Sequence, residues 1–102
     1  MNQSNNKTSI NYQDYLIESL KDPEEAIAYL NAALEDDQDT FLLALHNVAQ
    51  AWGFSHLANK TGLDRAGLYR MLSSGGNPKL KSLHSLLHAI GLRISIVKDS
   101  AA

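Results

Sequence analysis

Residues 54–73 read FSHLANKTGLDRAGLYRMLS, and their apolar spacing around a central glycine is typical of two short helices joined by a tight turn. Two short amphipathic segments meet at residues 61–64, where Gly62 supplies the positive φ that a tight bend between helices requires. Ala58 lies four residues earlier, where two helices that cross steeply leave room only for a small side chain. Ser55 and Asp64 are expected to cap the two helices. We therefore predict a helix-turn-helix.

The predicted second helix has an inner and an outer face. Its inner face, together with the helix before it, is expected to bury Leu57, Leu63, Leu68 and Met71. In a DNA-binding helix-turn-helix the outer face enters the major groove. The candidates for base contacts on that face are Asp64, Arg65, Ala66, Tyr69 and Arg70.

Further polar residues flank this face and are candidates for phosphate contacts. They are Ser55, His56, Lys60, Asn77, Lys79 and Lys81. Arg65 and Arg70 have the geometry for bidentate hydrogen bonds to guanine, whereas the lysines would add salt-sensitive affinity without reading sequence. For each residue the alternative is an ordinary solvated surface group.

Length and composition indicate a single domain. The chain has 102 residues, with 44% hydrophobic and 20% charged residues, as in an ordinary globular protein. We expect a disordered tail over residues 1–13, rich in Asn and Ser, followed by one domain over 14–102. The absence of cysteine, of a signal peptide and of a long apolar run favours a cytoplasmic protein with no membrane partner.

The net charge of −2 conceals two halves of opposite sign. Residues 1–53 hold two basic and nine acidic residues, and residues 54–102 hold seven basic and two acidic ones. A basic helix-turn-helix joined to an acidic half suits a DNA-binding protein that has a second partner. The alternative is that the acidic residues are solvated helix faces and caps.

The flanking segments read as further helices. A short helix is expected from Tyr12 or Asp14 to Leu20, with Tyr15 on its inner side. Asp22 and Pro23 predict the start of a second helix, and Asp37 predicts the start of a third that ends at Gly53. Residues 73–78 are a cluster of turn formers, and the apolar spacing from Leu80 to Ile90 predicts another helix, ended by Gly91.

After Gly91 the hydrophobic period changes from helical to alternating. Leu92, Ile94 and Ile96 alternate with other residues, which predicts a short half-buried β-strand. A single strand needs a partner, so we expect these three residues to pair with a second copy of the chain or with the sheet edge of another protein. The expected fold is all-α, with five to six helices, a helix-turn-helix of the phage Cro and CI type, and this C-terminal strand.

No pattern in the chain indicates catalysis, a metal or a cofactor. His84 and His88 lie four residues apart on one predicted helix, but neither a catalytic glutamate nor a third ligand accompanies them, so we interpret them as surface or boundary histidines. We find no nucleophile or acid–base pair at useful spacing, and we expect a protein that is not an enzyme.

The chain resembles the addiction-module antidote proteins, the HigA-like helix-turn-helix antitoxins of type II toxin–antitoxin pairs. Four segments carry the resemblance: YLIESLKDPEEAIAYLNAALEDD at 15–37, FLLALHNVAQAWG at 41–53, HLANKTGLDRAGLYRMLS at 56–73 and GGNPKLKSLHSLLHAIGLRISI at 75–96. The resemblance implies a homodimer that binds double-stranded operator DNA, represses its own operon and neutralises a cognate toxin. The chain lacks a long C-terminal tail for wrapping a toxin, so the acidic N-terminal half is the expected toxin-binding surface.

Two other functions fit the same residues. One is a phage-type repressor without a toxin partner, because many repressors share the helix-turn-helix. The other is a protein-interaction module in which the helix-turn-helix is only a scaffold.

Overall fold

Aspartate caps and glycines set the helix boundaries of this protein. The computed structural model describes residues 11–100, and these residues form six α-helices. The helices are α2 (Asn11–Ser19), α3 (Pro23–Leu34), α4 (Gln38–Trp52), α5 (Phe54–Thr61), α6 (Arg65–Met71) and α7 (Leu80–Ala89). The predicted all-helical architecture is therefore confirmed for the described residues.

Three of the predicted caps are present. Asp22 accepts a hydrogen bond from the backbone N–H of Glu24 at 3.0 Å, with Pro23 at the first helical position of α3. Asp37 accepts from the N–H of Thr40 at 2.8 Å, and hydrogen bonding by the backbone and side chain of Thr40 holds the pKa of Asp37 below its ordinary value. Asp64 caps α6, and these short-range signals explain why three helix starts were predicted correctly.

The prediction that Ser55 caps α5 was wrong. Gly53, with φ of 97°, serves both as the C-cap of α4 and as the N-cap of α5, so α5 begins one residue before Ser55. Ser55 is consequently an exposed residue inside the first turn. A positive φ at Gly53 turns the chain so sharply that no intervening capping residue is needed.

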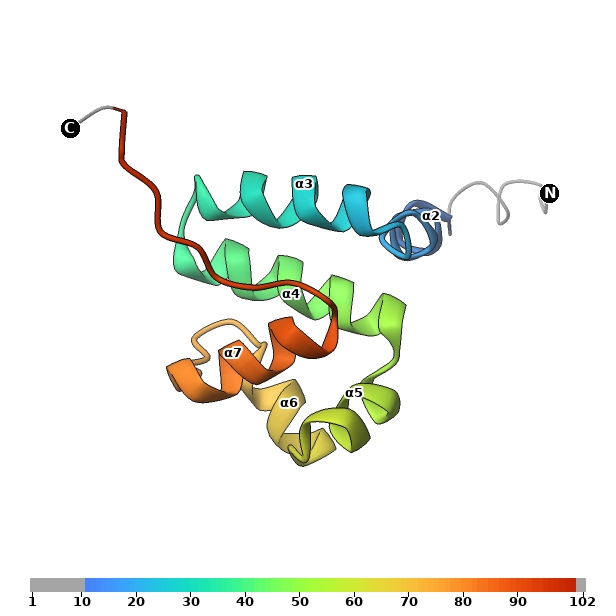
Figure 1. Ribbon diagram of the computed structural model, residues 1–102. Helices are drawn as coiled ribbons and strands as arrows, with labels where there is room; N and C mark the ends of the chain where they lie inside the picture. The colour runs from blue at the N-terminus through green and yellow to red at the C-terminus, as the bar shows by residue number, and fades with distance from the viewer. Residues whose placement is uncertain (1–10, 101–102) are drawn as a thin grey trace, which may run out of the picture.

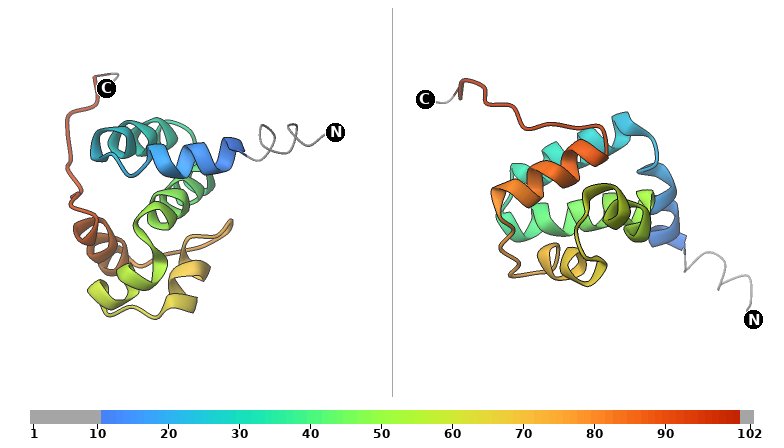
Figure 2. Two further views of the ribbon diagram at one scale, coloured as in Figure 1. Left: turned by 90° about the vertical axis from the view of Figure 1, so that its right-hand side faces the viewer. Right: turned by 60° about the horizontal axis from the view of Figure 1, so that its bottom comes forward.

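The six helices are arranged around α4. Figures 1 and 2 show α2 and α3 at one end of the molecule, α5 and α6 at the other, and α4 between them, with α7 beside α5. Leu45, Val48 and Ala49 of α4 are fully buried at the centre of the core, and Leu57, Leu68 and Leu86 join them from α5, α6 and α7. The broad apolar stripe of α4 thus contacts both ends of the molecule.

A buried asparagine fastens the N-terminal helices to α4. Asn47 is buried, donates to the hydroxyl of Tyr29 in α3 at 2.9 Å, and accepts from the side-chain amide of Gln13 in α2 at 3.2 Å. Satisfying both ends of its amide offsets the cost of burying it. Tyr15 of α2 is exposed, contrary to its expected place on the inner side.

The predicted C-terminal β-strand was wrong. Gly91, with φ of 90°, ends α7, and the N–H of Leu92 donates to the carbonyl of Leu87 at 2.8 Å. Residues 92–99 then run irregularly past α4 toward α3, and no strand is present between residues 11 and 100 (Figures 1 and 2). Leu92 packs against the core, whereas Ile94 is partly exposed and Ile96 is 95% exposed. Alternating residues can form a strand only beside another extended backbone, and the described part of this chain has none.

The N-terminal boundary also differs from the expected one. Residues 11–13 of the expected tail belong to helix α2, and residues 1–10 lie outside the described part of the structure. Among the described helices, none combines the length and the apolar character needed to cross a lipid bilayer.

Candidate nucleic-acid interface

The turn between α5 and α6 is held by local hydrogen bonds. Gly62 adopts a left-handed conformation with φ of 75°, and its N–H donates to the carbonyl of Ala58 at 2.9 Å. The hydroxyl of Thr61 donates to the carbonyl of Leu57 at 2.7 Å and accepts from the N–H of Leu63 at 3.1 Å. These bonds satisfy the polar groups at the end of α5 and set the direction in which α6 leaves the turn.

The inner face of this helix pair matches the sequence prediction. Leu57 and Leu68 are completely buried, and Leu63 and Met71 are partly buried against the same core. Ala58 is also partly buried where α5 approaches its neighbours. Burial of this face leaves the opposite side of α6 in solvent.

All five candidates for base contacts are exposed at α6. Asp64 caps the N-terminus of α6, where its carboxylate accepts a hydrogen bond from the N–H of Gly67 at 3.0 Å. Arg65, Ala66, Tyr69 and Arg70 lie within the seven residues of α6. The guanidinium carbon of Arg65 lies 5.9 Å from the centre of the Tyr69 ring, a cation–π distance. The outer face of α6 therefore carries two guanidinium groups and one tyrosine.

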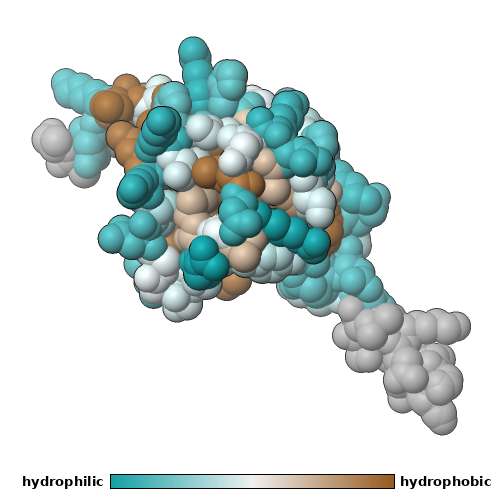
Figure 3. Space-filling view, turned by 90° about the horizontal axis from the view of Figure 1, so that it is seen from below, coloured by the Kyte–Doolittle hydropathy of each residue, from teal (hydrophilic) through white to brown (hydrophobic). Residues whose placement is uncertain are grey.

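The candidates for phosphate contacts come from three segments around α6. Ser55, His56 and Lys60 are exposed on α5, Asn77 is exposed in the loop after α6, and Lys79 and Lys81 are exposed at the start of α7. This end of the molecule, seen from below in Figure 3, shows hydrophilic side chains around a smaller apolar patch. The side chains that sequence reasoning grouped thus lie on the three segments that adjoin α6.

The loop that carries Asn77 is fastened to the start of α4. The N–H of Gly75 donates to the carboxylate of Asp39 at 3.0 Å, and the side-chain amide of Gln38 lies 3.4 Å from the carbonyl of Gly76. The hydroxyl of Ser73 donates to the carbonyl of Arg70 at 2.8 Å. These contacts hold the loop between α6 and α7 in place. The loop leads directly to Lys79, so they also fix where Lys79 lies.

Two rings that pack behind Tyr69, those of Phe54 and His46, were missed by sequence reasoning. Phe54 of α5 stacks on Tyr69 with ring centres 4.1 Å apart. His46 of α4 lies 5.1 Å from Phe54 and 5.7 Å from Tyr69. Contacts among three helices leave no trace in the periodicity of any one of them, so only the fold reveals that Tyr69 is held from behind.

Burial lowers the pKa of His46, and Nε2 of this ring is buried without a hydrogen-bond partner among the described residues. The unfolded chain therefore binds a proton at this position more readily than the folded protein does. Stability should fall as the pH drops below about 6.5, and the loss should level off once the pH is below the folded pKa of His46.

Urea unfolding at about pH 7.5 and about pH 5.5 measures this effect. The difference in stability between the two pH values should shrink in a His46→Gln variant and persist in His56→Gln, which changes an exposed histidine. Equal pH dependence in the wild type and both variants would assign the effect to other groups.

His84 and His88 are both exposed on α7. Within residues 11–100 no three His, Cys, Asp or Glu side chains come together as a set that could hold a metal. The outer face of α6 therefore remains the feature of this end of the molecule with the clearest binding chemistry.

Comparison with known proteins identifies the family. The model of a family described as "Probable addiction module antidote protein" matches residues 9–98. The chain belongs to this family. An uncharacterized protein of Haemophilus influenzae (strain ATCC 51907 / DSM 11121 / KW20 / Rd) is 35% identical over 86 residues, covering 83% of this chain and 89% of the relative. No solved structure matches the chain. Membership of the antidote family supports an antitoxin role and implies a toxin partner.

Proposed function

We propose that this protein is a sequence-specific DNA-binding antitoxin of the HigA-like, type II kind. It acts as a cytoplasmic homodimer, represses its own operon and neutralises a cognate toxin. The observation that carries the DNA-binding part is the exposure of Arg65, Tyr69 and Arg70 together on α6, just after a turn held by Gly62. Family membership supports the antitoxin part.

The residues on and around the outer face of α6 have different proposed roles in DNA recognition. Arg65 and Arg70 donate to O6 and N7 of guanine in the major groove. Tyr69 either donates its hydroxyl to a phosphate or packs its ring against a thymine methyl. Lys60, Lys79 and Lys81 neutralise phosphates and position the helix without reading sequence. A homodimer places two copies of α6 on half-sites about 34–36 Å apart, so the operator is expected to be a near-palindrome.

Fluorescence anisotropy tests the DNA-binding proposal. The protein should bind the DNA upstream of its own reading frame more tightly than it binds a shuffled sequence of equal length. Affinity should fall steeply as salt is raised, because each phosphate contact releases about one counterion. Failure to bind any upstream fragment, even at low salt, would overturn the proposal.

Co-expression tests the antitoxin part. A small basic protein encoded beside this chain should arrest growth when it is expressed alone, and growth should recover when this chain is expressed with it. The two proteins should also co-purify. A neighbouring protein that is harmless, or that stays toxic in the presence of this chain, would leave a repressor without a toxin partner.

A further inference from the structure

The molecule has an apolar groove between its N-terminal and C-terminal elements. A pocket of about 560 Å³ lies between α3, α7 and residues 92–97. Ile27 and Leu34 of α3 line one side, Leu83 and Leu87 of α7 line another, and Val97 belongs to the C-terminal segment. Figures 1 and 2 show that segment returning from the end of α7 toward α3.

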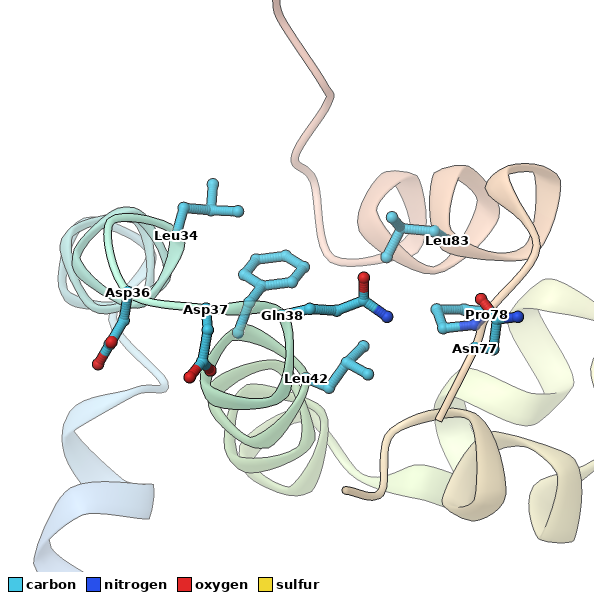
Figure 4. Close-up of a pocket in the computed structure, with 9 residues that line it drawn as sticks. Leu34, Asp36, Asp37, Gln38, Leu42, Asn77, Pro78 and Leu83 are labelled. Atoms are coloured by element: carbon cyan, nitrogen blue, oxygen red, sulfur yellow. The ribbon is translucent and has the colours of Figure 1, made fainter. Parts of the chain in front are cut away.

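A second pocket continues this groove toward the connection between α3 and α4. It has a volume of about 430 Å³ and shares Leu34, Phe41 and Leu83 with the first pocket. Figure 4 shows Leu34, Gln38 and Leu83 around this space, with the carboxylates of Asp36 and Asp37 at its outer edge, directed away from it. We call the two pockets together the α3–α7 groove.

The side chains of the groove are apolar yet accessible. Leu34 is 58% exposed, Ile27 is 43% exposed and Val97 is 79% exposed. Single exposed apolar side chains are ordinary, but a set that lines one continuous groove is typical of a surface that another molecule covers. Such a surface gains free energy when a partner removes it from water.

The charges around the groove indicate what kind of partner fits. Glu35, Asp36 and Asp37 form an exposed acidic run at the α3–α4 end, and Asp39 follows in the first turn of α4. Arg93 is the one cation among the described residues that line either pocket, and it belongs to the C-terminal segment. The α3–α4 end is therefore electronegative, and it complements a partner that carries Lys or Arg there.

We propose that the α3–α7 groove is the toxin-binding site, occupied by a segment of a basic partner protein. The segment places a row of apolar side chains along the groove and presents lysine or arginine side chains to Asp36 and its acidic neighbours. This inference rests on the proposed antitoxin function. It places the toxin where α3 of the acidic N-terminal half meets α7 and the C-terminal segment. Leu34 is central to it, because this residue lines both pockets.

A matched pair of leucine variants tests whether the toxin contacts the apolar side chains of the groove. Leu34 and Leu43 are 58% and 59% exposed, but Leu43 lines neither pocket. The probe is the small basic protein encoded beside this chain, and its affinity is measured by calorimetry. Leu34→Gln should weaken the complex by about tenfold or more, and Leu43→Gln by less than about twofold. Operator binding by both variants serves as the test of folding.

A second pair of variants tests whether the basic partner contacts the acidic residues at the edge of the groove. Asp36→Lys should weaken the complex and reduce its salt dependence, because it places a like charge opposite the basic partner. Glu25→Lys makes the same change at an exposed site on α3 outside both pockets, and it should have a smaller effect.

Three results would overturn the inference. Equal losses in the Leu34 and Leu43 variants would place the toxin elsewhere. A Leu34→Gln protein that becomes monomeric in light scattering, while the wild type is a dimer, would make the groove the contact between two copies of this chain. If the unmodified chain forms no complex with the probe, the proposed antitoxin function itself fails, and this inference fails with it.

Discussion

Replacing Gly76 by alanine should destabilise the protein by about 1–3 kcal/mol, the usual cost of forcing extra atoms into a closely packed site. A Cβ at this position would overlap the carbonyl oxygens of Met71 and Ser73, which are backbone atoms that cannot rotate away. The N–H of Gly76 also donates to the carbonyl of Ser73 at 2.8 Å, so the loop has little freedom to move. Relief of the overlap would pull the loop away from Gln38 and Asp39.

Gly67 provides the matched control. It lies inside α6, and a Cβ there would meet its nearest neighbours in the side chains of Asp64 and Arg70 at 3.6–3.7 Å, an ordinary contact distance. Alanine favours a helix by up to about 1 kcal/mol relative to glycine, so Gly67→Ala should leave stability unchanged or raise it. Urea unfolding of both variants measures the difference. Equal stability of the two would show that the loop accommodates a side chain at position 76.

Local chemistry explains which parts of the fold the sequence revealed. Asp22, Asp37 and Asp64 each accept a hydrogen bond from an N–H two or three residues later, so short patterns were enough to predict three helix starts. Gly62 has the positive φ that the turn required. The outer face of α6 followed from helical periodicity, because burial of Leu57 and Leu68 determines which side remains exposed.

The sequence predictions failed, or were silent, for features that depend on residues far apart in the chain or on the exact first residue of a helix. The alternation of Leu92, Ile94 and Ile96 is local, but a strand exists only beside a second extended backbone, and the described residues supply none. The contacts among His46, Phe54 and Tyr69 join three helices, and the α3–α7 groove joins α3, α7 and the C-terminal segment. Such features require knowledge of how the helices pack.

The ring cluster gives Tyr69 a specific place in the proposed recognition surface. Phe54 is buried and stacks on the Tyr69 ring, so the tyrosine side chain is held from behind while its outer side stays exposed. Arg65 lies against the same ring. A side chain ordered before DNA arrives loses less conformational entropy on binding. Arg70 has no such ring contact among the described residues, which makes it the simpler of the two arginines to test.

Replacing Arg70 by alanine should weaken binding to the operator by about 1–3 kcal/mol, the usual value of one bidentate contact to a guanine. Arg70 is exposed in the last turn of α6, and its removal leaves the buried face of the helix intact. Affinity for shuffled DNA should change much less, because Arg70 is proposed to read a base. Anisotropy titrations against operator and shuffled DNA, at the same salt concentration, measure the two losses.

Lys79→Ala is the control for charge alone. Lys79 is exposed beside the start of α7, and its proposed partner is a phosphate. Its loss should weaken binding to both DNAs by similar factors and reduce the salt slope by about one. If Arg70→Ala behaves in the same way as Lys79→Ala, Arg70 only neutralises phosphate and the sequence-reading role passes to Arg65 or Tyr69. If neither Arg70→Ala nor Arg65→Ala changes either affinity, the outer face of α6 does not enter the major groove, and the helix-turn-helix is a scaffold for protein contacts.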